Sequence, residues 1–152
     1  MRSAAYFGGF ALAVGASTAG GTGSPAEAQH SASGKAIYAV NCASCHGARG
    51  EAASGWDRPD ATGEMPPPPH DRQGHTWKHS DAMLYRIVAN GWRDPYNKTK
   101  RLTMPAFAEV LSPSQMREVV IYLKTLWTPE QQKFQLEESE HAPFPPGATQ
   151  AP

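Results

Sequence analysis

The fold of this chain is decided by the stretch Cys42-Ala43-Ser44-Cys45-His46, which reads C-x-x-C-H. This pattern is the attachment signature of a c-type haem. Two thiols with this spacing can each form a thioether with a haem vinyl group, and the histidine that follows can then bind the iron from one side. The chain has only two cysteines, and both lie in the motif. We therefore predict one covalently attached haem c, held by Cys42 and Cys45 with His46 as an axial ligand.

Two other uses of a C-x-x-C pair remain open at this point. A structural zinc site needs four ligands, and the sequence has no second cysteine pair to complete one. A redox disulfide of the thioredoxin type should lie near a β-α-β pattern, which the sequence does not show. Both alternatives are therefore weaker than haem attachment.

The segments around the motif resemble those of a known family. The stretch from Gly34 to Cys42 has the glycine and aromatic spacing that opens class I cytochromes c. Downstream, Gly74-His75-Thr76-Trp77 and Met104-Pro105-Ala106-Phe107 are similar to segments of an exported bacterial branch of monohaem class I cytochromes c. The resemblance extends from about Gly34 to Trp127. It implies an all-α fold of about three to five helices wrapped around one covalently bound haem.

Helix signals occur at four places in the sequence. The first predicted helix covers residues 34–43, with Ser33 as its cap, and the second covers residues 80–90, between Ser80 and Gly91. The third follows the capping box Ser112-Pro113-Ser114-Gln115, and a short fourth helix should begin after Thr128. The resemblance implies that the first and third helices cross at Gly34 and Tyr38, on the face that carries Val119, Val120 and Leu123. Alternatively, Gly34 belongs to a turn.

Residues 47–77 lack helical or strand periodicity and contain Pro66-Pro67-Pro68-Pro69. In the family that the chain resembles, a proline carbonyl in this loop accepts the N–H of the axial histidine. Pro68 fits this role best by its distance from residues 74–77, while Pro67 and Pro69 remain possible. The other interpretation is a plain polyproline spacer.

Two further residues of this region, Trp77 and His75, are candidates for the surroundings of the haem. The indole N–H of Trp77 is a donor that could serve a haem propionate, or the ring could simply cover the porphyrin edge. His75 is the other polar candidate near the haem. We expect His70 and His79 at the surface, because neither belongs to a ligand motif.

The sixth iron ligand is predicted to be Met104. It lies between two predicted helices, and Pro105 stiffens the backbone that would present its sulfur. Met83 and Met116 are explained by the apolar faces of helices, and Met65 directly precedes the four prolines. An open or histidine-ligated iron is the remaining alternative. Methionine and histidine together raise the reduction potential of a cytochrome c.

The two ends of the chain fall outside the resemblance. Arg2, the apolar run from Ala4 to Ala16 and the site Ala26-Glu27-Ala28 read as an export signal that is cleaved before Gln29, or as an uncleaved anchor. We therefore divide the chain into a signal peptide (1–28), a cytochrome c domain (29–128) and a short helix with a disordered proline-rich tail (129–152). The expected location is the periplasm, with no stable membrane span after cleavage.

The balance of basic and acidic residues limits the kinds of partner that we expect for this protein. The 14 basic and 14 acidic residues leave no basic excess for a nucleic acid. A basic loop could steer an acidic partner, or it could simply be solvated; it carries Arg93, Lys98, Lys100 and Arg101. We expect a monomer that is not an enzyme and that carries single electrons between protein redox partners, such as an oxidase, reductase or dehydrogenase. The alternatives are a haem peroxidase or gas sensor with a labile sixth ligand, and the cytochrome subunit of a larger redox enzyme.

Overall fold

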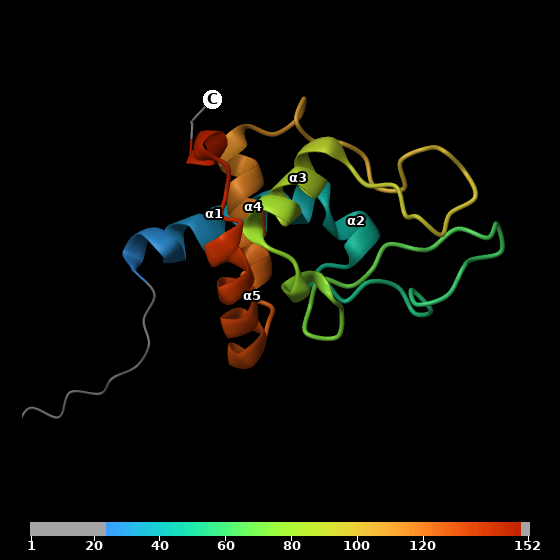
Figure 1. The fold of residues 1–152 in the computed structure, drawn as a ribbon, viewed down its shortest axis with the longest axis horizontal. Helices are drawn as coiled ribbons and strands as arrows, with labels where there is room; N and C mark the ends of the chain where they lie inside the picture. Colours follow the sequence, from blue (N-terminus) through green and yellow to red (C-terminus); the bar gives the residue numbers. More distant parts are fainter. Residues whose placement is uncertain (1–23, 150–152) are drawn as a thin grey trace, which may run out of the picture.

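The protein is an assembly of helices around one apolar core, with two long loops on one side (Figure 1). The computed structural model describes residues 24–149. Its α-helices are α1 (Pro25–Asn41), α2 (Ala43–His46), α3 (Asp81–Asn90), α4 (Pro113–Lys124) and α5 (Pro129–His141), and its 3-10 helices are η1 (Thr76–Lys78) and η2 (Pro146–Thr149). Over these residues no strand forms, and an isolated antiparallel β-bridge joins Trp92 and Met104. The predicted all-α fold is confirmed.

Local capping accounts for where most helices begin. The side chains of Ser80, Ser112 and Thr128 each accept a backbone N–H from the first turn of α3, α4 and α5, as their sequences predict. The start of α1 was predicted wrongly. It begins at Pro25, because Ser24 and Glu27 form a capping box with proline at the first helical position.

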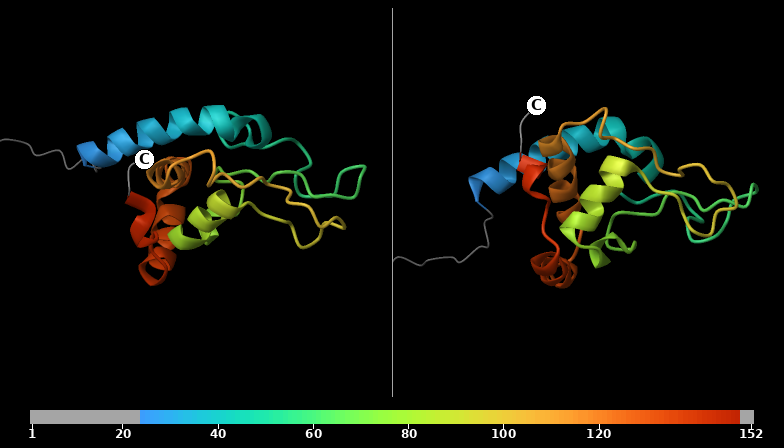
Figure 2. Two further views of the ribbon diagram at one scale, coloured as in Figure 1. Left: turned by 90° about the horizontal axis from the view of Figure 1, so that it is seen from above. Right: turned by 45° about the horizontal axis from the view of Figure 1, so that its top comes forward.

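Helices α1 and α4 cross at very close range (Figure 2). Gly34 lies inside α1, not in a turn, and a Cβ built on it would overlap the carbonyl oxygen of Glu118. One turn along α1, the Tyr38 ring packs against Tyr122 with 5.2 Å between ring centroids. Tyr38 also belongs to the core cluster that includes Val119, Val120 and Leu123. Gly34 itself contacts Glu118 and Tyr122 of α4. These residues lie beside the face of α4 that the sequence predicted for the crossing.

The C-terminal segment is ordered and packed as far as Thr149, so the expected disordered tail was wrong over these residues. Gln135 on α5 is 1% exposed, and its amide donates to the Asp81 carboxylate on α3 at 2.7 Å. Further on, the Phe144 ring lies 5.3 Å from the Arg117 guanidinium, and Ala148 is fully buried. The composition of this segment is polar and rich in proline, but a few side chains at the right positions anchor it to α3 and α4.

The predicted export signal lies largely outside the described residues, which begin at 24. The proposed cleavage point before Gln29 falls within α1. Across residues 24–149 the helices are all too short or too polar to cross a lipid bilayer.

Candidate haem site

An apolar cavity lies between α1, α2, α3 and α4, beside the C-x-x-C-H motif. It brings together three of the predicted site residues from distant parts of the sequence, Cys42, His46 and Met104. The rest of its lining consists of Tyr38, His70, Thr76, Leu84, Ile87, Val88, Val119, Val120 and Leu123. A cavity with aliphatic walls, a thiol and two possible iron ligands has the chemistry that a covalently attached haem requires.

His46 is held in one orientation by the proline loop. It ends α2 with 6% of its surface exposed, and its Nδ1 lies 2.8 Å from the carbonyl oxygen of Pro68. A carbonyl only accepts, so Nδ1 must carry the ring proton, and Nε2 is left with a lone pair for a metal. Burial lowers the pKa of His46, although its bond to Pro68 acts in the opposite direction. The ring is therefore neutral and ready to bind iron.

Backbone contacts fix the proline loop behind this bond. The carbonyl of Gly50 accepts from the backbone N–H groups of His70 and Asp71, at 2.7 and 3.1 Å. On the other side Gly74 lies directly against Pro69, where any Cβ would overlap the Pro69 carbonyl oxygen. The segment is thus clamped on two sides, which places Pro68, and not its proline neighbours, against His46.

His70 does not lie at the surface, contrary to the sequence prediction. Its ring lines the cavity and packs on the His46 ring, with 4.0 Å between centroids. Its Nδ1 lies 2.9 Å from the hydroxyl of Thr76. Burial and the neighbouring His46 lower the pKa of His70 well below its ordinary value, so it is neutral. No sequence motif marks this residue, because the contact depends on the path of the clamped loop.

Trp77 belongs to η1, and its side chain lies outside the lining of the cavity. Its indole N–H donates to the Gly74 carbonyl at 3.0 Å, and its ring meets Phe134 of α5 edge-on. The indole donor, which the sequence offered as one possible partner for a propionate, is therefore engaged within the loop. Of its neighbours, His75 is exposed, while His79 is partly buried and not at the surface as predicted.

Met104 is presented to the cavity by a tight backbone arrangement. Its N–H and C=O both pair with Trp92, at 2.9 and 3.0 Å. The turn is possible because Gly91, with φ of 74°, leaves room for the Met104 carbonyl, which a Cβ would meet at 2.5 Å. The N–H of Phe107 then ties the segment to the end of α3 by donating to Val88 at 3.0 Å. Among the methionines of residues 24–149, Met104 is the one that lines the cavity.

The two thiols are not joined to each other. Cys42 is partly buried and Cys45 is exposed, and both are free. Burial raises the pKa of Cys42 to about 11, so its thiol is protonated at neutral pH. Across residues 24–149, no group of three or more His, Cys, Asp or Glu side chains gathers around one point as a metal cluster would. The donors around the cavity suit a haem that brings its own iron.

Comparison with known families settles the identity of this domain. A sequence model of the family described as cytochrome c matches residues 31–127, which include the motif, the cavity and Met104. The chain belongs to the cytochrome c family. Cytochromes c bind covalently attached haem c, and Cys42 and Cys45 have the C-x-x-C-H spacing of its attachment site. The matched region ends at Trp127, so α5 and the segment after it lie outside the matched region.

Two curated relatives are similar to part of the chain. They are the FixP subunits of cbb3-type cytochrome c oxidase from Sinorhizobium medicae and from Rhizobium meliloti, each 27% identical over 94 residues. The similarity covers 61% of this chain but only 29% of the length of either relative. No solved structure matches the chain.

Proposed function

We propose that this protein is a monohaem cytochrome c that carries single electrons, with His46 and Met104 as the two axial iron ligands. The observation that carries the proposal is their common cavity: His46 from α2 and Met104 from the loop before α4 line the same apolar space. Each is presented by backbone hydrogen bonding, His46 through Pro68 and Met104 through Trp92. An iron with both axial positions filled has no site for a substrate.

The chain's own residues suit electron transfer. When bound, haem c supplies an iron that gains and loses one electron. Pro68 keeps the proton on Nδ1 of His46 and raises the basicity of the ring, and the thioether of Met104 favours a high reduction potential. The aliphatic side chains of α3 and α4 exclude water from the cavity. Since these groups are held rigidly, little has to rearrange when the iron changes charge.

A protein redox partner such as an oxidase would dock near the Met104 loop. Three apolar side chains are exposed there, Trp92, Tyr96 and Leu102, among the basic residues Arg93, Lys98, Lys100 and Arg101. The FixP similarity supports an oxidase, either as a transient partner or as an enzyme to which this chain belongs. The reading of residues 1–28 as an export signal supports a periplasmic location. Electron transfer to an acidic partner should slow as ionic strength rises.

The sixth ligand is tested by spectroscopy on the purified holoprotein. The ferric form should show the weak long-wavelength band of sulfur-to-iron charge transfer, and the ferrous form should resist carbon monoxide near neutral pH. Met104→Ala should abolish the band, admit carbon monoxide and lower the potential. Met65→Leu and Met83→Leu serve as controls that keep the band. Rapid carbon monoxide binding by the unmutated protein would instead support a peroxidase or gas sensor.

A further inference from the structure

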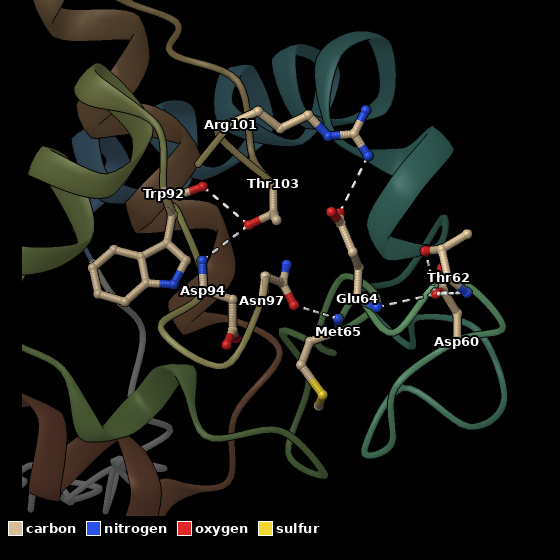
Figure 3. Close-up of polar contacts among 9 residues, drawn as sticks. All are labelled: Asp60, Thr62, Glu64, Met65, Trp92, Asp94, Asn97, Arg101 and Thr103. Carbon is tan, nitrogen blue, oxygen red and sulfur yellow. Dashed lines mark hydrogen bonds and ion pairs between the residues drawn. The ribbon is translucent and has the colours of Figure 1, made fainter. Parts of the chain in front are cut away.

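Two long loops meet on the side of the molecule away from α5. The first, residues 47–75, contains Pro68, and the second, residues 91–111, contains Met104. They run side by side in all views (Figures 1 and 2). Side chains join them at two points: the Met65 N–H donates to Oδ1 of Asn97 at 2.6 Å, and the Arg101 guanidinium lies 3.2 Å from the Glu64 carboxylate (Figure 3). We call Glu64, Asn97 and Arg101 the loop latch.

Glu64 is the acidic member of the loop latch, and its neighbours fix both its position and its charge. The Asp60 carboxylate accepts from the backbone N–H groups of Thr62 and Glu64, at 2.8 and 3.1 Å, which fixes the turn that presents Glu64. The Glu64 side chain is only 12% exposed. Hydrogen bonds from Thr99 and Arg101 lower its pKa, and the charge of Arg101 acts in the same direction, so the carboxylate is charged at neutral pH. Both of these partners come from the second loop.

Asn97 is the buried member of the latch. It is 5% exposed, and its Oδ1 accepts the Met65 N–H. Within residues 24–149 its Nδ2 has no hydrogen-bond partner. A buried amide is costly unless it is paired, so the bond to Met65 is the contact that keeps Asn97 inside. If this bond broke, Asn97 could move out to water together with the tip of its loop.

The second loop is also closed at its base, where Met104 lies. Met104 pairs with Trp92, and the Thr103 hydroxyl donates to the Trp92 carbonyl at 3.0 Å while accepting the Asp94 N–H at 3.2 Å (Figure 3). The segment from Trp92 to Met104 is therefore a closed loop. The pairing of Trp92 with Met104 holds its base, and the loop latch holds its tip. With both ends held, the loop has little freedom to move Met104 away from the cavity.

We propose that the loop latch is a positioning device that sets how readily Met104 leaves the haem iron. The proposal rests on Met104 as the sixth ligand. Lifting the second loop breaks the Met65–Asn97 bond and the Glu64–Arg101 pair together. The latch therefore keeps the iron closed to external ligands, and its opening is the step that admits them.

The test measures how fast imidazole, an external ligand, enters the ferric holoprotein. At saturating imidazole the observed rate reports the loss of the sixth ligand. Asn97→Ala should raise this rate roughly three- to tenfold, the effect of one lost net hydrogen bond. Arg101→Gln should also raise the rate of imidazole entry. Because the Arg101 side chain is 76% exposed, this variant should fold, and it provides the test if Asn97→Ala does not fold. Arg101→Lys should restore part of the closure, because it keeps the charge.

Lys100→Gln is the matched control, since it removes the same charge from the exposed neighbour of Arg101. Its rate should equal that of the unmutated protein. Equal rates in all the variants, or equal acceleration by Lys100→Gln and Arg101→Gln, would overturn the latch while leaving Met104 as the ligand. If the unmutated ferric protein lacks the sulfur-to-iron band and its ferrous form binds carbon monoxide at once, the proposed ligation fails and the latch's role fails with it.

Discussion

The Nδ1 atom of His46 lies 2.8 Å from the carbonyl oxygen of Pro68, across 22 positions of the sequence. This one bond selects the tautomer of the ring and leaves Nε2 available for iron. In the diamagnetic ferrous protein, nitrogen-edited NMR should therefore show a proton on His46 Nδ1 that exchanges slowly with water. The ring protons of the exposed His75 should exchange fast. An Nδ1 of His46 without a proton would contradict the arrangement.

The α1–α4 crossing should be sensitive to a single methyl group at Gly34. A Cβ at this position would overlap the backbone of Glu118, which cannot move without shifting α4. Gly34→Ala should lower the free energy of unfolding by about 1–3 kcal/mol through overpacking. Chemical denaturation measures the loss. Gly147→Ala is the control, because nothing lies within 4 Å of a Cβ there. If both variants lost the same free energy of unfolding, the result would contradict the close crossing of α1 and α4.

The partly buried His70, which lines the cavity, should make the stability depend on pH. Its pKa is lowered in the folded protein, so below about pH 6.5 the unfolded chain binds a proton that the folded one does not. Its contribution is therefore complete above that pH and decreases as the pH falls, by about 1.4 kcal/mol per pH unit. In His70→Asn, denaturation curves between pH 5 and 7 should show a shallower slope. An unchanged slope would mean that His70 is protonated in the fold.

The α5 extension should contribute to stability through Gln135. Its amide donates to Asp81 at 2.7 Å and to the Ser139 hydroxyl at 2.9 Å, and all three residues are buried. Gln135→Ala should cost about 1–3 kcal/mol, because it leaves polar atoms buried without a partner. Glu137→Ala, on the exposed face of the same helix, should change stability by less than about 0.5 kcal/mol. If the two variants melt alike, the extension is not part of the cooperative fold.

The covalent link is tested by extracting the denatured protein with acidified acetone. Because both cysteines lie in the C-x-x-C-H motif, the colour should stay with the polypeptide. Cys42→Ala and Cys45→Ala should each lower the yield of holoprotein, since the cofactor completes the core around the cavity. Free haem in the solvent after extraction of the unmutated protein would contradict thioether attachment.

Much of the fold follows from local features of the sequence. Haem attachment depends on five consecutive residues, and the starts of α3, α4 and α5 depend on caps that act within one turn. Such signals need no knowledge of the rest of the chain. The same reasoning misplaced the start of α1, because Ser33 also has the chemistry of a cap. In the structure its hydroxyl donates to Glu118 at 2.6 Å instead, and Ser24 caps the helix.

Contacts between distant residues decided the rest. The structure, not the sequence, places Pro68 rather than a neighbouring proline on His46, packs His70 on the same ring, and joins Asn97 to Met65. It also orders the tail, because Gln135 finds a buried carboxylate on another helix. Composition and periodicity describe what each segment could bury. Which polar group meets which is decided only when separate segments close around one core, because a buried donor or acceptor must find its partner there.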